Sequence, residues 1–409
     1  MCKLNQLVKE YLAATYNEIH NENLQRYRYN EKLPYIPRVS KWISLWLENK
    51  KIINIIYYLS LLLWLCGGYV FFVFFDLVKI GISKNKGFKK NNKIHKDMTY
   101  LAISLDSIEI MQNCKFFDAT TVNIFVVPWC DVNRDELSKS NYLYMTDYLS
   151  FNDYLNAFFY SIVSFIYCII NSNTRLWSLQ MYTAPKWFLV RIALGKLESN
   201  FVTTEHFDRW ATLVDRVCME KNKKLILIQH GSLKAIMRSE YSHFSIYSRL
   251  HSVSSLICYD ELEAKIFKEK ILRIKKNSPI RELYTGLGLK ITKTFSDKYS
   301  VFFIGHPQCE STQSRILCEL RKIFGNSIHV FYKEHPKAKA SMNVKCLDWE
   351  IIKNSDFYPD VDLAISYAST LGYQYEEVGI KVFFHDLSDN SDLISNNIIQ
   401  YIKAILKND

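Results

Sequence analysis

The sequence is poor in the two residue types that interrupt regular structure. Its 409 residues include only 12 glycines and 8 prolines, which argues against a loop-rich or fibrous protein. Hydrophobic residues make up 49% of the chain and charged residues 23%, a balance typical of a folded protein and not of a disordered one. A chain of this length can form two domains with full cores.

Paired cysteine motifs are also missing. The ten cysteines lie between Cys2 and Cys346, form no Cys-x-x-Cys pair and have no histidines at the spacing of a zinc site. We therefore expect reduced, mostly buried thiols in a cytosolic protein. Residues 1–30 are polar and charged and lack the apolar core of a secretory signal, which predicts a protein of the cytoplasm or of the inner face of the membrane.

The charge is unbalanced, with a formal net charge of +11. A basic surface can bind nucleic acid, or it can lie against anionic lipids and phosphorylated substrates. The sequence contains no zinc finger, basic helix or other nucleic-acid module. We therefore expect no nucleic-acid partner and favour a membrane surface and a phosphate-bearing substrate.

The most apolar part of the chain runs from Ile52 to Phe75 without a charged residue. These 24 residues are long enough to span a bilayer. Lysines lie on both sides of the run, so the positive-inside rule selects no orientation. A segment that dips into the membrane or lies in its interface around Gly67 and Gly68 is one alternative. A buried helical hairpin is another. Residues 1–97 are predicted to form this helical, membrane-associated part.

From residue 98 the pattern changes to alternating strands and helices. Buried strands are predicted at 99–105, 122–128, 200–205, 223–231 and 255–259, and helices at 150–197, 206–221 and 260–273. The apolar run Leu155–Ile170 is short for a membrane span, and we expect a core helix. Alternation of this kind predicts a mostly parallel sheet covered on both faces, in a domain of residues 98–290.

A second α/β unit is predicted for residues 291–409, after a boundary near 275–288. Its strands are expected at 299–307, 327–336, 361–367 and 381–385, and its helices at 311–325, 369–377 and 391–407. Ligands of open parallel sheets bind at the carboxyl ends of the strands. Polar residues that follow three of these strands are therefore candidates for one site. They are Gly305, His306 and Pro307; Lys333, His335 and Pro336; and Ser366, Ser369 and Thr370.

This set has the chemistry of a phosphate site. Ser369 and Thr370 stand at a predicted helix N-terminus, where N–H groups and the helix dipole favour an anion. His335 can hydrogen-bond a phosphate or ribose oxygen, and Lys333 can neutralise phosphate charge. Glu376 can accept from ribose hydroxyls. Taken singly, a serine before a helix is usually a cap and His-Pro after a strand is usually a turn.

The order of the motifs carries a family resemblance. Phe-Ile-Gly-His-Pro (303–307), Tyr-Lys-Glu-His-Pro (332–336) and Ser-Tyr-Ala-Ser-Thr-Leu-Gly-Tyr-Gln-Tyr-Glu-Glu-Val-Gly (366–379) resemble the C-terminal half of bacterial sialyltransferases, polysialyltransferases and Kdo transferases. The resemblance covers about 100 residues. It departs at Ala368, before the Ser-Thr pair, and at His306, where this family commonly has Gln.

The resemblance implies a GT-B glycosyltransferase, with two Rossmann-like domains that face a cleft. It implies that His335 and Pro336 contact the cytidine monophosphate of a CMP-sugar and that Ser369 and Thr370 hold its phosphate. It further implies transfer of a sialic acid or Kdo type of sugar to a capsule, O-antigen or other surface glycan, without a metal or other cofactor. A lipid-linked acceptor at the cytoplasmic face of the inner membrane would explain the apolar segment and its lysines.

Candidates for the general base lie in the first α/β unit. His230 follows a buried strand in Ile-Gln-His-Gly (228–231), a turn similar to the acceptor-side loop of several surface-polysaccharide and polyol-phosphate transferases. The ordinary pKa of histidine suits a base that takes a proton from an acceptor hydroxyl. His230 as a helix-capping turn residue is the alternative. Glu205 and Asp208, after another strand, are further candidate bases.

Three other functions compete with this hypothesis. A CDP-glycerol or ribitol type of polyol-phosphate transferase would share the fold and the His-Gly turn. A nucleotide-sugar 2-epimerase is disfavoured because its phosphate turn is Ser-Gly-Gly. A membrane scaffold with an inactive transferase fold is the non-enzymatic alternative.

Overall fold

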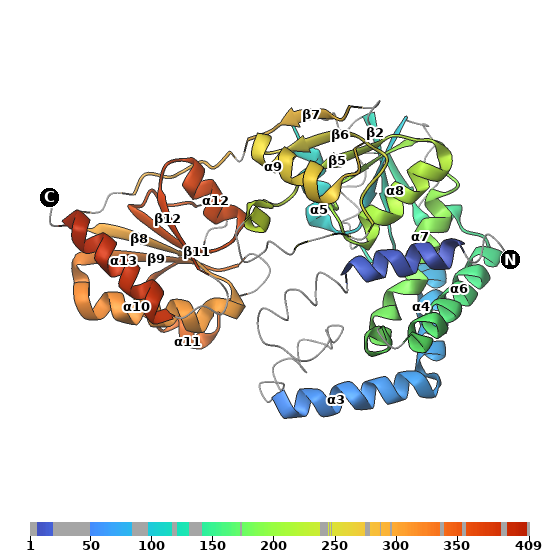
Figure 1. The fold of residues 1–409 in the computed structure, drawn as a ribbon, viewed down its shortest axis with the longest axis horizontal. Helices are drawn as coiled ribbons and strands as arrows, with labels where there is room; N and C mark the ends of the chain where they lie inside the picture. The colour runs from blue at the N-terminus through green and yellow to red at the C-terminus, as the bar shows by residue number, and fades with distance from the viewer. Residues whose placement is uncertain are drawn as a thin grey trace. The chain divides into compact units, whose positions relative to one another are not determined.

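The computed structural model shows two compact α/β units (Figure 1). It describes residues 6–18, 50–83, 97–116, 121–130, 141–171, 174–237, 244, 246, 248–274, 279–286, 288–294, 297–335, 339–353, 357–385 and 391–406. The first unit comprises Met1–His230 and Glu240–Thr285, and the second comprises Gly231–Ser239 and Gly286–Asp409. The short segment that follows His230 thus belongs to the second unit.

The first unit is built on a seven-stranded sheet in which every neighbouring pair is parallel. Its order is β3-β2-β1-β4-β5-β6-β7, so the chain leaves the middle of the sheet in one direction after β1 and returns to the other side at β4. This reversal is the switch point at which doubly wound sheets bind ligands. The strands are β1 (Met98–Ala102), β2 (Val122–Val126), β3 (Asn141–Tyr144), β4 (Asn200–Thr203), β5 (Leu225–Ile228), β6 (Val253–Cys258) and β7 (Arg281–Tyr284).

Helices cover this sheet because its strands are apolar on both sides. All five residues of β2 are buried, as expected for a strand in the interior of a parallel sheet. The buried helix α7 carries Trp187 and Phe188 into the core. The helices of this part are α5 (Leu105–Gln112), α6 (Phe151–Ile170), α7 (Ala184–Leu194), α8 (Arg209–Lys221) and α9 (Glu261–Ile266), with a π-helical turn, η8 (Phe267–Ile271).

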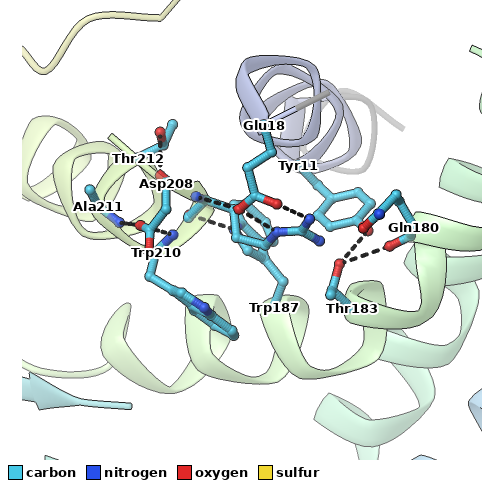
Figure 2. Close-up of polar contacts among 10 residues, drawn as sticks. Tyr11, Glu18, Gln180, Thr183, Trp187, Asp208, Trp210, Ala211 and Thr212 are labelled. Atoms are coloured by element: carbon cyan, nitrogen blue, oxygen red, sulfur yellow. Dashed lines mark hydrogen bonds and ion pairs between the residues drawn. The ribbon is translucent and has the colours of Figure 1, made fainter. Parts of the chain in front are cut away.

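The N-terminal helix, residues 6–18, packs on the rest of the first unit (Figure 2). The ring of Tyr11 lies 5.4 Å from that of Trp187 and 5.2 Å from that of Phe188. Glu18 forms an ion pair with the buried Arg209 and accepts from the Arg209 N–H at 3.0 Å. Of the residues 1–97 predicted to be helical, 6–18 and 50–83 are helical, and 1–5, 19–49 and 84–96 lie outside the described residues.

The apolar run forms two helices that meet at a bend. Helix α3 (Lys50–Leu63) leads through the π-helical turn η1 (Trp64–Gly68) to α4 (Tyr69–Ser83). Gly67, at φ 105°, breaks the helical backbone between them. By length and composition, Tyr58–Ser83 and Phe151–Ile170 could each cross a membrane. Helix α6 differs from the expected core helix, because it buries one stripe and exposes large apolar side chains such as Phe151 and Phe159.

The second unit repeats the same topology with five parallel strands in the order β10-β9-β8-β11-β12, so its switch point lies between β8 and β11. Val301 and Phe303 of β8 pack on one face, and Phe302 and Ile304 pack on the other. The strands are β8 (Tyr299–Ile304), β9 (Ile328–Lys333), β10 (Glu350–Ile352), β11 (Leu363–Tyr367) and β12 (Lys381–His385). The helices are α10 (Glu310–Phe324), α11 (Met342–Lys345), α12 (Thr370–Glu377) and α13 (Ser391–Leu406).

The predicted α/β class with two Rossmann-like parallel sheets is therefore confirmed. Helix α12 begins at Thr370, one residue after the predicted start, with Ser369 as its N-cap.

Candidate functional site

A pocket of about 730 Å³ opens in the second unit where β8, β9 and β11 end. The three strand ends that the sequence singled out meet here because they belong to neighbouring parallel strands. This position, beside the switch point, is where open α/β sheets bind ligands. The pocket is lined by Ser232, Ile304, Gly305, Lys333, Glu334, His335, Lys339, Ile352, Lys353, Tyr358, Tyr367, Ala368, Ser369, Thr370, Leu371 and Gln374.

The N-terminus of α12 forms one wall of this pocket. Ser369 is its N-cap, and its Oγ accepts from the Gly372 N–H at 2.9 Å. The hydroxyl of Ser366 donates to the Tyr367 carbonyl at 2.6 Å, so the 2.9 Å contact between the two serine hydroxyls is donated by Ser369. The N–H groups of the first two helical residues, Thr370 and Leu371, have no acceptor within a helix. They are the groups that can hold an anion at this wall.

Two glycines allow this wall and the strand ends to come close together. A Cβ on Gly305 would lie 2.2 Å from the Tyr332 hydroxyl and 2.9 Å from the Lys333 carbonyl oxygen. A Cβ on Gly372 would lie 2.8 Å from both the Ser366 Oγ and a ring carbon of Phe384. Glycine at these positions therefore lets β8 approach β9 and lets α12 pack directly on β11 and β12.

The charges along the pocket favour an anion. Lys333 is buried; its ammonium donates to the Phe357 carbonyl at 3.0 Å and lies 4.5 Å from the centre of the Tyr358 ring. Lys339 and Lys353 line the pocket from exposed positions. Among the described lining residues Glu334 is the one that is acidic; it accepts from the Ala340 N–H at 3.0 Å and pairs with Lys345 at 3.4 Å. Its charge is thereby compensated, and the part of the lining that the structure describes has a net positive charge.

Aromatic rings supply flat apolar surface beside these charges. Tyr358 and Tyr367 both line the pocket. The His306 ring centre lies 5.0 Å from that of Tyr367 and 5.0 Å from that of His335. Burial, and then the charge of His335, lower the pKa of His306. Burial likewise raises the pKa of Tyr367 to about 12, so its hydroxyl keeps its proton near neutral pH.

Five of the predicted donor-site residues line the pocket: Gly305, Lys333, His335, Ser369 and Thr370. Ser366 and His306 are not among the described lining residues, but each contacts one that is. Ser366 accepts a hydrogen bond from Ser369, and the ring of His306 packs against that of His335. Pro307 begins a short 3-10 turn, η9 (Pro307–Cys309), and Glu376 is exposed on α12; neither is among the described lining residues. Pro336 lies outside the described residues.

Other lining residues were not predicted. The sequence contains a signal for one of them, Gln374, and none for another, Ser232. Gln374 stands four residues after Thr370, so helical periodicity places it on the same face of α12. Ser232 reaches the pocket from a distant part of the sequence, and its N–H donates to the Thr370 Oγ at 3.0 Å. No local pattern in the sequence marks this contact.

An acidic pair, Asp360 and Asp362, supplies carboxylates of the kind that bind divalent cations. It precedes β11, at the end of the strand opposite to the pocket. The Asp362 carboxylate accepts from the N–H and the hydroxyl of Ser300 at 2.6 and 2.7 Å. This carboxylate therefore joins β11 to β8 and does not face the pocket.

The candidate bases lie at the carboxyl ends of β4 and β5 in the first unit. His230 is exposed, and its Nδ1 lies 2.5 Å from the Thr204 carbonyl oxygen. Because a carbonyl only accepts, Nδ1 carries the proton, and Nε2 of the neutral ring has a lone pair. The N–H of His230 donates to Nε2 of the buried His206 at 3.1 Å, and the two rings are 4.2 Å apart. Burial, and then the charge of His230, lower the pKa of His206 well below 6.5. His206 is therefore neutral, and its Nε2 can accept from the His230 N–H.

The two predicted carboxylate bases are linked to each other. Asp208 is the N-cap of α8 and accepts from the N–H groups of Trp210 and Ala211 at 2.9 and 2.8 Å (Figure 2). Its side chain also hydrogen-bonds that of Glu205. Burial, and then the neighbouring Glu205 carboxylate, raise the pKa of Asp208 well above its ordinary value. Asp208 thus caps α8, and its role as a base stays a prediction, as does that of Glu205.

Comparisons with known proteins give only slight likenesses. No protein-family model matches the chain, and no curated protein matches its sequence. One similar structure is the Glycosylation Associate Protein (Gap123) complex from Streptococcus agalactiae, with 14% identity and a TM-score of 0.25 over 49% of this chain and 47% of that one. Another is a UDP-forming α,α-trehalose-phosphate synthase from Burkholderia xenovorans, with 8% identity and a TM-score of 0.38 over 75% of this chain and 91% of that one. The chain spans less than half of the first of these structures, and TM-scores of this size assign no family.

Proposed function

We propose that this protein is a glycosyltransferase whose second unit binds the nucleotide part of an activated sugar. The observation that carries the proposal is the pocket at the ends of β8, β9 and β11, where the N-terminus of α12 meets a net positive lining. Dipole, N–H groups and lysines together favour a phosphate over a neutral ligand. The more specific proposal is a CMP-activated sugar acid of the sialic acid or Kdo type, transferred to a surface or lipid-linked glycan.

The phosphate is proposed to lie at the Thr370 and Leu371 N–H groups. The hydroxyl of Ser369 is already engaged on both sides, with Gly372 and Ser366, so its role is to fix the first turn of α12. The Thr370 hydroxyl accepts from Ser232 and keeps its own proton to donate. As the bond to the sugar breaks, negative charge grows on the leaving phosphate, and these fixed donors stabilise it.

The nucleoside is proposed to lie against the tyrosines. The rings of Tyr358 and Tyr367 provide surfaces on which a base can stack, and such stacking accepts every base. Preference for cytidine therefore rests on the resemblance of the His335 motif alone. His335 lines the pocket and can hydrogen-bond a ribose or phosphate oxygen.

The acceptor hydroxyl is proposed to lose its proton to His230. The Thr204 carbonyl fixes the tautomer that leaves Nε2 as the base, and the ring is exposed to an incoming acceptor. Glu205 is the second candidate. The reaction as proposed uses side chains and helix N–H groups, without a metal.

Ligand-induced stabilisation tests the nucleotide site. The melting temperature of the purified protein is measured with CMP, UMP and GMP at equal concentrations. We expect CMP to raise it, and Lys333→Met and Thr370→Val to reduce the shift, while Lys322→Met, on the exposed face of α10, keeps it. No shift with any nucleotide would overturn the nucleotide site, and a shift with UMP or GMP but not CMP would overturn the cytidine assignment.

Product formation tests the transferase itself. CMP-sialic acid, CMP-Kdo and CDP-glycerol are offered with a lipid-linked acceptor extract, and release of CMP is followed. Transfer from a CMP-sugar that is lost in His230→Ala supports the proposed reaction. Transfer from CDP-glycerol alone would establish the polyol-phosphate alternative, and binding without any transfer would indicate the scaffold.

A further inference from the structure

Helix α4 is apolar on two opposite sides, and only one of them is buried. Its inner stripe, Tyr69, Val73, Leu77 and Ile80, is buried in the first unit, where α4 contacts α6 and α7. Phe71, Phe74, Phe75, Val78 and Ile82 recur at helical spacing on the other side and form what we call the outer stripe. Phe71, Phe74 and Phe75 are 68%, 54% and 65% exposed. The outer stripe therefore places a row of large apolar side chains in water, which marks an interaction surface.

The inner stripe holds α4 against the protein. The Tyr69 hydroxyl lies 3.2 Å from both the Ser161 and the Met181 carbonyl oxygens, and its ring stacks on that of Phe165 at 4.1 Å. Figure 1 shows α4 beside α6 in the first unit. The bend at Gly67 separates α4 from α3. Helix α4 alone, with 15 residues, is about 22 Å long, against roughly 30 Å for the hydrocarbon core of a bilayer. A helix fixed in this way can lie in the surface of a membrane but is too short to cross it.

The negative charge of α4 lies on its buried side and the positive charge on its exposed side. Asp76, its only acidic residue, is largely buried and pairs with Lys186 at 3.7 Å. Lys79, one turn further on, is exposed. The exposed side of the helix thus carries apolar side chains and a positive charge, and the whole chain has a net charge of +11. A second copy of this chain would bring like charges together, whereas an anionic membrane surface meets complementary ones.

We propose that the outer stripe of α4 is a monotopic membrane-binding surface, which inserts into one leaflet of an anionic bilayer without crossing it. Burial of three phenylalanines supplies the apolar part of the binding, and Lys79 with the net positive charge supplies the electrostatic part. This surface would hold the protein where lipid-linked acceptors lie. It does not depend on the glycosyltransferase proposal, because it uses no residue of the nucleotide pocket.

Vesicle sedimentation of the full chain tests the surface. Vesicles of phosphatidylcholine alone are compared with vesicles of phosphatidylcholine and phosphatidylglycerol in equal parts. We expect binding to the anionic vesicles that weakens with salt, and a loss of at least about tenfold in F71S/F74S/F75S. The matched control is M342S/L393S, which removes two side chains of similar exposure, 71% and 63%, from the second unit.

The melting temperatures of the same variants show whether a loss of vesicle binding comes from the surface itself or from a damaged fold. Because the three phenylalanines are exposed, the triple variant should keep the melting temperature of the wild type and any nucleotide-induced shift. Equal sedimentation of triple variant and wild type would overturn the proposal. So would a wild-type dimer in solution that the triple variant dissociates, since the stripe would then be a contact between copies.

A cysteine in the bend reports on insertion. Cys66 is exposed between α3 and α4, and Cys318 and Cys346 are exposed in the second unit. A membrane-impermeant maleimide, with the modified peptides quantified by mass spectrometry, should label Cys66 more slowly when anionic vesicles are present. Labelling of Cys318 and Cys346 should stay unchanged. Unchanged labelling of Cys66 on vesicle-bound protein would contradict insertion at this bend.

Discussion

The hydroxyl oxygens of Ser366 and Ser369 lie 2.9 Å apart at the turn that joins β11 to α12. Ser369 donates to Ser366 and accepts from the Gly372 N–H, so one side chain ties the end of a strand to the first turn of the next helix. This contact fixes the first turn of α12, whose residues Thr370 and Leu371 line the pocket. The geometry of the candidate phosphate site thus depends on a hydroxyl that need not touch the ligand.

Ser369→Ala should therefore weaken both the helix and the site. Loss of the N-cap is expected to cost about 1 kcal/mol in the free energy of unfolding. We also expect nucleotide affinity to fall about tenfold because the first turn of α12 loses its anchor. Urea unfolding and nucleotide titration measure the two effects. Ser341→Ala, which removes the cap of α11 outside the described lining, should lower stability alone; equal loss of affinity in both variants would contradict a local role for Ser369.

Gly305→Ala should destabilise the second unit. The added Cβ would meet the Tyr332 ring and the Lys333 backbone at distances that real contacts do not allow, so β8 and β9 must shift. We expect a loss of about 2 kcal/mol, in the range of overpacked cores. Gly81→Ala is the matched control, because its Cβ would lie 3.8 Å from Tyr154, an ordinary contact within a helix. It should leave stability unchanged or raise it by about 0.5–1 kcal/mol. Equal melting temperatures for the two variants would show that Gly305 is not needed for close packing.

The strands that the sequence did not reveal all lie at sheet edges, although one edge strand, β12, was predicted from its apolar residues Val382–Phe384. Interior strands such as β2 and β8 are continuous apolar runs because helices cover both of their faces, and they were predicted within a few residues. The three missed strands, β3, β7 and β10, all lie at sheet edges. Edge strands are short and partly polar, and Arg281–Tyr284 lacks the apolar run by which a strand is recognised.

The same difference explains which site residues could be found. His335 and Ser369 directly follow interior strands, so their position on one edge followed from the strand prediction alone. Lys353 follows the missed strand β10 and was missed with it. Ser232 is brought to Thr370 by the path of the chain, a long-range relation that one sequence does not encode in any local pattern.

Glu18→Ala should weaken the packing of the N-terminal helix on the rest of the first unit. The Arg209 guanidinium is buried, and Glu18 pairs with its side chain and accepts from its backbone N–H. Removal of the carboxylate leaves a buried positive charge without this partner, at a cost of about 3 kcal/mol. Chemical denaturation measures it. Glu269→Ala breaks an exposed pair with Lys265 and should have no measurable effect; equal losses in both variants would mean that burial does not strengthen the Glu18 pair.

The neutral His206 should make stability fall in mild acid. Burial, and then the charge of His230, hold its pKa well below 6.5 in the native protein, whereas the unfolded chain binds a proton there near pH 6.5. The stability that His206 contributes is therefore fully present above about pH 6.5 and is lost as the pH falls towards the native pKa, by at most about 1.4 kcal/mol for each pH unit.

His206→Gln cannot be protonated, and its side-chain oxygen can still accept from the His230 N–H. The free energy of unfolding, measured between about pH 7.5 and pH 5.5, should fall more steeply for the wild type than for His206→Gln. Parallel slopes would show that the native pKa of His206 is not lowered; a protonated His206 could not accept from the His230 N–H, and the assigned hydrogen bond between them would be wrong.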